Sequence, residues 1–298
     1  MKYLGTSLQR YQFKPLLLPV LTAEIAESIL KAMEENRSYV EETINLGLSM
    51  SLLLIENSEV RIREDIVVSR DHLLKMLKDP RAVYLVDRYG VYKVEIRAYG
   101  HYYKLVAVAK NKAPTVEING IHMHRVESTD PWSDSMAKVR LARVKKGHRV
   151  LDICTGMGYT AIASRMMGAT YVLTIEKDEN VLEIARANPW SRRLSDPQIE
   201  IMLKDATEAV KELETSSFHR IIHDPPRFSM AGELYSREFY QELYRVLKPN
   251  GVLYHYVGSP GARYRGLDVL GGVASRLRRV GFIVKPLRSQ GAILAFKV

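Results

Sequence analysis

The first feature of this sequence that could do chemistry is a glycine loop preceded by an acid. Asp152 is followed by Gly156 and Gly158 within the run 150–161. Glycines permit positive φ angles and let the backbone approach a ligand closely. The Gly-x-Gly-x-x-Ala spacing is shared by dinucleotide sites, so the loop alone leaves NAD and another adenosine cofactor open. The Asp152 carboxylate favours a cationic ligand, because it would repel a pyrophosphate.

Two further acids stand where a nucleoside could be held. Glu176 closes the next apolar run, and a carboxylate there can accept hydrogen bonds from both ribose hydroxyls. Asp205 follows the run after that, at a position where an acid can hold an adenine amino group. Either adenosine cofactor uses such acids, so these two residues support a nucleoside ligand without choosing one.

A stiff acidic turn follows the fourth run. Asp224 is succeeded by Pro225, Pro226, Arg227 and Phe228, and the two prolines fix their own φ angles. Asp224 and the Pro225 carbonyl can accept hydrogen bonds from an amino group and aim its nitrogen at an electrophile, while Phe228 can stack on a planar base. We therefore predict group transfer to an amine, with Asp224, Pro225, Pro226 and Phe228 as the catalytic residues.

The elements that must position these residues show an α/β rhythm. Short apolar runs alternate with helix-compatible stretches from about residue 149, which predicts a parallel sheet with crossover helices. We expect a helix over Gly266–Val280, then an antiparallel hairpin of Phe282–Leu287 and Ala292–Val298. The carboxyl ends of parallel strands meet at one edge, which brings the acids together. The five expected parallel strands are Arg149–Ile153, Tyr171–Ile175, Ile199–Leu203, His219–His223 and Gly251–Val257.

Residues 1–126 lack this rhythm and are expected to form a smaller α+β domain. Thr22–Asn36 predicts a helix capped by Thr22, and Asp71–Lys78 predicts a second helix. A helix-turn-helix competes with strand for Ser38–Ser49, and the β-branched content makes us favour strand. The other stretches typical of strands are Val40–Glu56, Ala82–Val86, Tyr92–Ala98, Tyr102–Ala109 and Thr115–His124.

The two domains are expected to divide before residue 127. Residues 127–298 then form the catalytic domain, and residues 1–126 are assigned to recognition of the substrate. The segment Glu127–Lys138 joins them and is read equally as a lid over the crevice or as a linker.

The charge distribution points to a polyanion. The net charge is +10, and it is concentrated in residues 101–150, with ten basic against four acidic side chains, and in residues 251–298, with eight against one. Such blocks are typical of RNA-binding surfaces, in which Arg276, Arg278 and Arg279 would take part, although a solvated basic face is also consistent with them.

Composition excludes several classes of protein. Cys154 is the only cysteine, so an internal disulfide and a cysteine zinc site are excluded, and its place in the glycine loop argues against a cytosine-C5 nucleophile. His122 and His124 alternate along an expected strand, and we predict no metal site. No apolar run reaches membrane-spanning length and no leader pattern is present, so we expect a cytoplasmic protein without membrane contact.

The ordered acids and glycines resemble the motifs of class I S-adenosylmethionine-dependent methyltransferases over residues 130–298. This resemblance implies a Rossmann-like seven-stranded sheet with a reversed final strand, and S-adenosylmethionine as cofactor. Gly156 and Gly158 would lie beside the methionine part of the cofactor, and Asp152 would lie near its amino group. Glu176 would hold the ribose, and Asp205 would hold the adenine. The neighbours that complete the implied cofactor site are Thr155, Tyr159, Thr160, Lys177 and Ala206.

The turn at Asp224 resembles the Asp-Pro-Pro-aromatic motif of amino-methyltransferases. Arg227 stands where that family has its aromatic, which weakens the stacking role of Phe228 and could place Arg227 on a phosphate. Over most of the chain, the sequence is also similar to an archaeal family of predicted methyltransferases associated with N4-methylcytidine in ribosomal RNA. The segments that carry this likeness are Ile121–Arg125, Asn188–Arg192, Ile222–Ser229, Glu233–Tyr235 and His255–Gly258.

Two other functions stay open beside a cytosine-N4 methyltransferase of ribosomal RNA. A small-molecule or polyamine-type amine transferase can use the same sheet, although a polycation needs an acidic pocket and the C-terminal quarter is basic. A non-catalytic RNA-binding protein with a relict cofactor site is disfavoured by the intact acids. The histidines at 223 and 255 fit either a pocket lining or a buried, hydrogen-bonded core.

Overall fold

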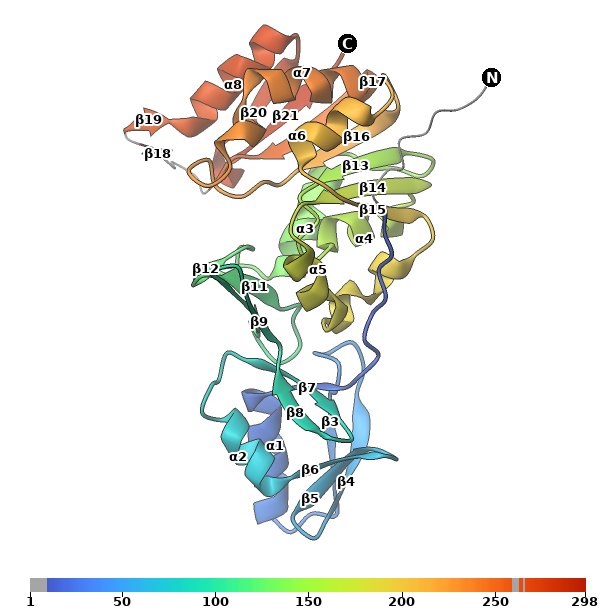
Figure 1. The fold of residues 1–298 in the computed structure, drawn as a ribbon, viewed down its shortest axis with the longest axis vertical. Helices are drawn as coiled ribbons and strands as arrows, with labels where there is room; N and C mark the ends of the chain where they lie inside the picture. Colours follow the sequence, from blue (N-terminus) through green and yellow to red (C-terminus); the bar gives the residue numbers. More distant parts are fainter. Residues whose placement is uncertain (1–9, 259–262, 265) are drawn as a thin grey trace. The chain divides into compact units, whose positions relative to one another are not determined.

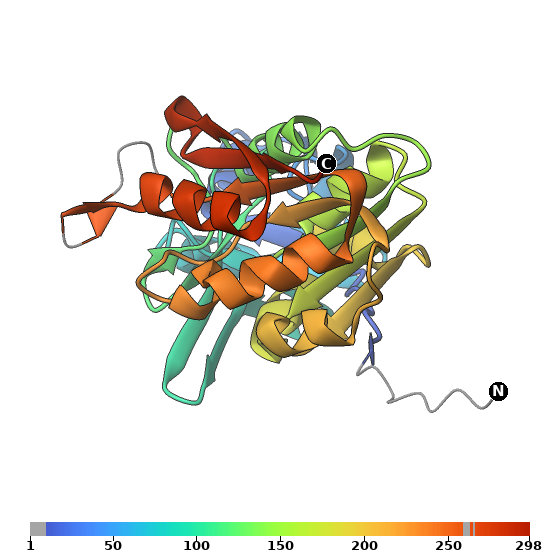
Figure 2. The ribbon, with the colours of Figure 1, turned by 90° about the horizontal axis from the view of Figure 1, so that it is seen from above.

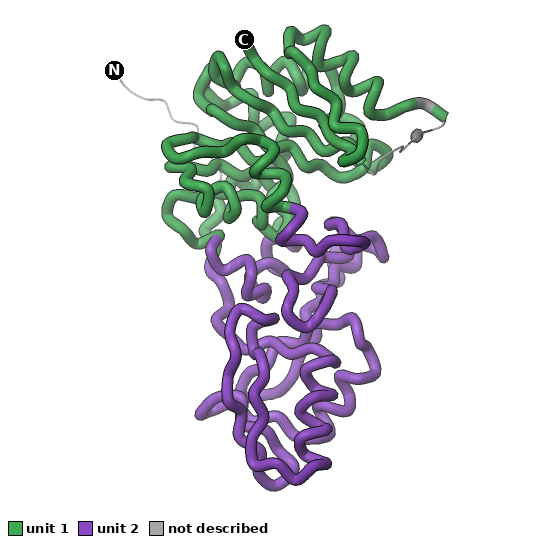
Figure 3. The backbone as a smooth tube through the Cα atoms, turned by 180° about the vertical axis from the view of Figure 1, so that it is seen from behind, with its two compact units in different colours: residues 1–13, 135–179, 194–298 green, residues 14–134, 180–193 purple. Residues whose placement is uncertain are grey.

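A computed structural model describes residues 10–258, 263–264 and 266–298. The chain forms two compact units (Figure 3). Unit 1 comprises residues 1–13, 135–179 and 194–298, and unit 2 comprises residues 14–134 and 180–193. The two units are described separately below.

Unit 1 is built on an eight-stranded sheet with the order β1-β15-β14-β13-β16-β17-β21-β20 (Figure 1). The run from β15 to β17 is parallel, and β21 is antiparallel to both of its neighbours. This is the expected seven-stranded order with a reversed final strand, extended by β1. Its strands are β1 (Arg10–Tyr11), β13 (Arg149–Ile153), β14 (Tyr171–Glu176), β15 (Ile199–Leu203), β16 (Phe218–His223), β17 (Leu247–Tyr256), β20 (Ile283–Leu287) and β21 (Ala292–Phe296).

The strands expected from the sequence are confirmed, with two differences. β17 begins at Leu247 instead of Gly251, because Leu247 pairs with Phe218 before a shift in register. β1 was not expected, since two residues carry too little periodicity to be recognised as a strand; it pairs antiparallel with β15, at Arg10 opposite Met202.

One face of the sheet is covered by α6, α7 and α8. Their apolar side chains form one core with the strand residues that alternate toward them, among them Leu151, Ile221 and Leu253. Figure 2 shows α7 and α8, in orange and red, lying along this face. The helices of unit 1 are α4 (Tyr159–Met166), α6 (Ala206–Ala209), α7 (Arg237–Val246) and α8 (Val269–Val280), with the 3₁₀ turns η2 (Val210–Glu212), η3 (Gly232–Tyr235) and η4 (Arg288–Gln290).

The C-terminal helix starts later than expected. α8 begins at Val269, because the Asp268 side chain caps it by accepting a hydrogen bond from the backbone N–H of Gly271 at 3.0 Å. The short strands β18 (Arg263–Tyr264) and β19 (Leu267–Asp268) precede it. The position between them, 265, lies outside the described residues.

Unit 2 contains the expected α+β elements. The α1 helix is capped by Thr22, whose side chain accepts a hydrogen bond from the N–H of Ile25, as predicted. Its elements are β2 (Val20–Thr22), α1 (Ala23–Glu34), β3 (Tyr39–Glu42), β4 (Ser51–Glu56), β5 (Glu59–Arg63), β6 (Ile66–Ser69), α2 (Arg70–Met76), β7 (Val83–Asp87), β8 (Gly90–Lys93), β9 (Glu95–Ala98), β10 (His101–Val106), β11 (Thr115–Ile118) and β12 (Ile121–His122).

Three small antiparallel sheets organise unit 2. Their orders are β3-β4-β5-β6, β2-β7-β8 and β12-β11-β10-β9. The strand favoured for the start of Ser38–Ser49 is present as β3, so that segment is not a helix-turn-helix. The β5–β6 hairpin was missed by the sequence analysis because its alternating charges resemble a solvated loop.

Residues 180–193 belong to unit 2. A single domain boundary before residue 127 does not predict this. The indole Nε1 of Trp190 donates to the Leu46 carbonyl at 3.0 Å, and the Trp190 ring lies 5.7 Å from that of Trp132. This segment contains most of α5 (Glu179–Arg186) and of η1 (Pro189–Ser195). Helix α3 (Pro131–Leu141), which was not expected as a helix, begins in unit 2 and ends in unit 1.

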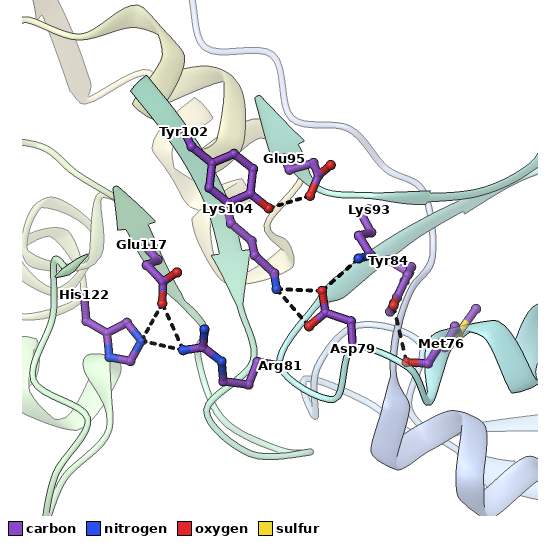
Figure 4. A network of polar contacts seen from close by, with 10 residues as sticks. All are labelled: Met76, Asp79, Arg81, Tyr84, Lys93, Glu95, Tyr102, Lys104, Glu117 and His122. Carbon is purple, nitrogen blue, oxygen red and sulfur yellow. Dashed lines mark hydrogen bonds and ion pairs between the residues drawn. The ribbon is translucent and has the colours of Figure 1, made fainter. Parts of the chain in front are cut away.

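A charged network joins the sheets of unit 2 (Figure 4). The Asp79 carboxylate accepts hydrogen bonds from Lys93 and Lys104, each at 2.8 Å. Burial acts to raise the pKa of Asp79, and the bonds from the two lysines outweigh it, so the pKa is lowered. Because β8 and β10 each supply one lysine, this acid ties two sheets together.

None of the helices in the described ranges has the length and apolar character that a membrane-spanning helix needs.

Candidate active site

The glycine loop lies between β13 and α4. Gly156 and Gly158 both have positive φ angles, of 53° and 76°. A Cβ added at Gly158 would lie 2.4 Å from Cδ2 of Leu194, which is closer than carbon atoms can approach. The loop therefore requires glycine at 158 for its conformation and for the space around it.

Glu176 is fixed at the end of β14 by backbone groups. Its Oε2 accepts a hydrogen bond from the N–H of Gly156 at 3.0 Å, and its Oε1 accepts from the N–H groups of Lys177 at 2.9 Å and Asp178 at 3.1 Å. Burial raises the pKa of this carboxyl, against the lowering effect of the three N–H groups. Glu176 thus connects the glycine loop to the next strand in a rigid arrangement.

Asp152 is fully buried in β13. Its Oδ2 accepts a hydrogen bond from Thr174 at 2.7 Å, and Thr174 also contacts the Thr155 hydroxyl at 2.7 Å. Its Oδ1 is buried and has no hydrogen-bond partner among the described residues. Burial raises the pKa of Asp152 to about 7. A buried acceptor without a partner is the kind of group that a ligand donor or cation satisfies.

Asp205 caps the helix that follows β15. Its Oδ1 accepts hydrogen bonds from the backbone N–H of Thr207 at 2.8 Å and from its hydroxyl at 2.6 Å, and α6 begins at Ala206. The carboxylate is thereby held at the same strand edge as Glu176.

Asp224 follows β16 directly and holds a lysine ammonium. The Nζ of Lys138 donates to Oδ2 of Asp224 at 2.6 Å, and the same Nζ lies 4.8 Å from the centre of the Tyr256 ring. Lys138 is buried in α3, with 5% of its surface exposed. The neighbouring ends of β16 and β17 thus already provide a carboxylate and an aromatic face to a primary amine.

The turn after Asp224 is anchored from α7's side of the sheet. The Tyr235 hydroxyl donates to the Pro226 carbonyl at 2.8 Å. The Phe228 ring meets the Tyr235 ring edge-on, with centres 5.3 Å apart and planes at 83°. Tyr235 therefore fixes both the proline turn and the aromatic side chain behind it.

The two histidines of this region belong to the core. His223 Nε2 contacts the Leu234 carbonyl at 3.0 Å, and His255 Nε2 contacts the Tyr240 hydroxyl at 2.9 Å. Burial lowers the pKa of His223 to about 4 and that of His255 well below its ordinary value. Of the two interpretations left open by the sequence, buried and hydrogen-bonded histidines are the correct one.

The edge formed by these strand ends is acidic although the chain is basic. The pKa of the Cys154 thiol is raised well above its ordinary value by burial and then by Glu176, Asp224 and Asp152. A thiol at this pKa stays protonated and is no nucleophile. Three carboxyl groups therefore lie near the glycine loop, and Lys138 and Lys177 offset part of their charge.

The histidines of the N-terminal half bind protein groups. His122 Nε2 lies 3.1 Å from Oε2 of Glu117, which also accepts from Arg81 (Figure 4). His124 Nδ1 lies 2.9 Å from the Thr115 hydroxyl. Within the part of the chain that the structure describes, no cluster of three or more ligating side chains could hold a metal ion.

The structure brings the predicted site residues of unit 1 to one edge. β13 lies between β14 and β16, with Ile153 paired to both Ile175 and His223, so the glycine loop, Glu176 and Asp224 follow neighbouring strand ends. The chain order reverses here, which is where sheets of this kind bind ligands. Lys138 and Tyr256 were missed, because a lysine in a connecting segment and a tyrosine at a strand end carry no spacing signal.

The structural comparison establishes the fold. A spermidine synthase crystallised with the transition-state analogue AdoDATO aligns with a TM-score of 0.54 at 21% identity, over 68% of this chain and 73% of that one. The mixed α/β Rossmann-like methyltransferase fold expected from the sequence is thereby confirmed.

Sequence comparison finds similarity over the whole chain and over parts of it. The uncharacterized protein MJ1233 of Methanocaldococcus jannaschii is 43% identical over 288 residues, which cover 95% of this chain and 96% of that protein. The model of the spermine/spermidine synthase domain matches residues 140–266. A polyamine aminopropyltransferase of Mycobacterium tuberculosis is 28% identical over 129 residues, 41% of this chain and 24% of that protein.

Proposed function

This chain belongs to the family of the M. jannaschii protein MJ1233, and from that premise we propose that it is a transferase that moves an alkyl group from an adenosyl sulfonium donor to the nitrogen of an amine. The observation that carries the proposal is the pair of Asp224 and Lys138, in which the strand-end carboxylate holds an amine nitrogen at 2.6 Å.

The acidic edge fits an adenosyl sulfonium. The donor, S-adenosylmethionine or its decarboxylated form, supplies an electrophilic carbon bonded to a positively charged sulfur. The buried Oδ1 of Asp152 offers an acceptor to a cationic group, Glu176 would hold the ribose, and Asp205 the adenine. Gly156 and Gly158 hold the loop backbone at positive φ angles beside these acids, and Thr155, Tyr159 and Thr160 would complete the site.

Asp224 would orient the acceptor. A carboxylate that accepts an N–H turns the nitrogen lone pair away from itself and toward the crevice. The proline turn, fixed by Tyr235, keeps this carboxylate from moving away. An aliphatic ammonium must first give a proton to Asp224 or to water, because only the neutral amine has the lone pair that attacks the sulfonium carbon. The amino group of a base is already neutral and loses its proton after the new bond forms.

The first candidate acceptor is an aliphatic amine of the polyamine type. Three observations support it: the match to the spermine/spermidine synthase domain over residues 140–266, the similarity to an aminopropyltransferase, and the acidic strand edge. The basic C-terminal quarter argued against a polycation, but the strand ends at the site carry the carboxyl groups of Asp152, Glu176 and Asp224, of which Asp224 is paired with Lys138.

The second candidate acceptor is the exocyclic amino group of an RNA base, with cytosine N4 of ribosomal RNA as the specific proposal. The turn Asp224-Pro225-Pro226 favours it, because two acceptors on a stiff turn suit a planar amino group. In that case Phe228 would contact the base, Arg227, which is exposed, would contact a phosphate, and unit 2 would bind the RNA.

One experiment separates the two acceptors and tests the common proposal. The purified chain is incubated with S-adenosylmethionine or with its decarboxylated form, in the presence of di- and polyamines or of RNA from a strain that lacks the gene. Mass spectrometry then identifies an alkylated amine or a methylated nucleoside. An aminopropylated or methylated polyamine supports the first candidate and N4-methylcytidine the second; alkylation of oxygen or carbon in place of nitrogen would overturn the proposal.

A further inference from the structure

A strongly basic surface lies on the opposite edge of the unit 1 sheet, where the parallel strands begin. It is formed by the segment before β13 and by the residues that begin β16 and β17. We call it the amino-edge patch, and its members are Arg143, Lys145, Lys146, His148, Arg149, His219, Arg220 and Lys248.

The cations of the amino-edge patch lack acidic partners. Among the described residues, none of its six lysine and arginine side chains forms an ion pair within 4.0 Å of a carboxylate. The carboxylate of Glu200, which contacts Tyr171 beside Arg149, is paired with Arg10 at 2.9 Å. The positive charge of this surface is therefore not balanced by neighbouring acids.

Two imidazole rings lie within the patch. His148 and His219 stack with ring centres 5.2 Å apart and planes at 8°. The Nδ1 of each ring accepts a backbone hydrogen bond, from the N–H of Lys145 at 3.1 Å and of Arg149 at 3.0 Å. A neutral imidazole whose Nδ1 accepts must carry its hydrogen on Nε2, so each ring has one N–H donor.

Burial and the surrounding positive charge keep both rings neutral. The pKa of His148 is lowered to about 4 by burial and then by Arg220, His219 and Lys145. The pKa of His219 is lowered by burial and then by Lys248, Arg220 and Arg149. At neutral pH the patch therefore carries six cations, of which Arg220 donates to the Arg143 and His219 carbonyls, and two uncharged donors.

The loop that carries four of the cations is held in place. The N–H of Gly147 donates to the Gly168 carbonyl at 3.1 Å, and the N–H of Thr170 donates to the His148 carbonyl at 2.8 Å. The Arg149 guanidinium lies 4.2 Å from the centre of the Tyr171 ring. A ligand that binds here meets an arrangement that is already formed, which lowers the entropic cost of binding.

Several other basic residues of the two basic blocks are occupied within the fold, whereas Arg278, Arg279 and Lys285 also form no ion pair among the described residues. In the block 101–150, the lysines at 104, 110, 112 and 138 and the arginine at 125 each pair with a carboxylate. In the block 251–298, Arg288 pairs with Asp268, and Lys297 donates to the carbonyls of Tyr244 and Leu247. Most of the first block's unpaired charge thus belongs to the amino-edge patch.

The composition of the patch selects the class of partner. None of its residues, and none of the large side chains between them in the described loops, is an exposed apolar group. A membrane anchor needs apolar side chains to insert, and a protein interface needs an apolar or aromatic centre. Unbalanced cations with N–H donors instead suit phosphates, and the donors also suit a ribose 2′-hydroxyl.

We propose that the amino-edge patch binds the phosphodiester backbone of an RNA, without reading its sequence. This surface lies at the strand end opposite to Asp224, so it would anchor a large RNA and would not position the reacting nitrogen. The proposal does not depend on which amine is the acceptor, and it stands or falls separately from the proposed transferase activity.

The test uses the full chain and a fluorescent RNA hairpin, with anisotropy measured over a range of salt concentrations. The variant Arg143→Gln/Lys145→Gln/Lys146→Gln removes three exposed charges of the patch. The matched control, Arg278→Gln/Arg279→Gln/Lys285→Gln, removes three exposed charges of α8 and β20. Circular dichroism checks that both variants melt like the wild type.

We expect the patch variant to lose at least about tenfold in RNA affinity and its log–log salt slope to fall by about three, one for each phosphate contact removed. The control should change both quantities little. Equal losses in the two variants would show that net charge alone binds RNA, and a larger loss in the control would place the surface on α8; either result overturns the proposal. A DNA hairpin bound as tightly as the RNA would overturn the assignment to RNA.

Discussion

The two edges of the unit 1 sheet carry opposite charge although the same strands run between them. At the carboxyl ends, Asp152, Glu176 and Asp224 lie around the glycine loop, and burial together with these acids raises the pKa of Cys154. At the amino ends, burial together with the cations around His148 lowers its pKa to about 4. Parallel strands all begin at one edge of the sheet and all end at the other. Basic residues near the strand starts and acidic residues near the strand ends therefore gather at opposite edges of the unit 1 sheet.

This difference teaches that net charge is a poor guide to a site. The chain carries +10, yet the edge proposed for chemistry attracts cations. The opposite charges of the two edges also suit different ligands. The acidic edge suits a sulfonium and an amine, and the basic edge suits a polyanion.

The largest effect is expected at the acceptor carboxylate of the acidic edge. Asp224→Ala should lower the rate of transfer by about 10³-fold while leaving the dissociation constant of S-adenosylhomocysteine nearly unchanged, because Asp224 orients the acceptor and not the donor. Transfer is followed with labelled donor, and donor affinity by calorimetry. Since Ala leaves Lys138 buried without its carboxylate, Asp224→Ala/Lys138→Met serves as the second variant; full activity in it would contradict the assigned role.

The donor carboxylate comes next. Glu176→Ala should weaken S-adenosylhomocysteine binding by about 30-fold, which corresponds to about 2 kcal/mol for one charged hydrogen-bonding group. Glu179→Ala removes the same charge from an exposed position three residues later and should leave affinity unchanged. Equal losses in both variants would mean that the acidic edge acts only through its overall charge.

The buried acid of β13 should make stability depend on pH. Its folded pKa of about 7 lies above the unfolded value of about 3.9, so the folded state binds the extra proton and stability falls as pH rises from about 4 to 7. Asp152→Asn removes this penalty and should be more stable than the wild type at pH 8, by about 4 kcal/mol, and within about 1 kcal/mol of it at pH 4.5. Urea unfolding at both pH values measures this, and an unchanged difference between them would refute it.

The smallest expected effect is on the free energy of unfolding, and its test compares one glycine from each edge of the sheet. Gly158 and Gly147 have similar φ angles of 76° and 87°, but only at Gly158 would a Cβ meet Leu194. Gly147→Ala should cost about 1 kcal/mol, the penalty of the left-handed region. Gly158→Ala should cost at least about 1 kcal/mol more because of the collision, and should also weaken donor binding. Thermal melts and calorimetry give both values, and equal melting temperatures would argue against a tight loop.

Much of unit 1 could be predicted because its signals are local. The strands Arg149–Ile153 and Ile199–Leu203 are each a short apolar run bounded by polar residues, and they form with the expected bounds. The hairpin of β20 and β21 follows from two such runs around a tight turn. The acids at the strand ends could be placed together because parallel topology fixes where the ends meet.

What could not be predicted depends on contacts between distant residues. Lys138 reaches Asp224 across 86 positions of the chain, and Trp190 reaches Leu46 across 144. The spacing of apolar residues along the chain carries no information about such contacts. A count of charges in a segment also does not show which of them are available to a ligand. Lys104 is buried in a pair with Asp79, whereas Lys145 is exposed, and both contribute equally to the count.

The most direct test of the central claim is a crystal structure of the chain with S-adenosylhomocysteine. The account predicts that the ligand lies along the glycine loop, with its ribose on Glu176 and its sulfur facing the Asp224 turn. A ligand bound elsewhere, or one whose sulfur points away from Asp224, would contradict it.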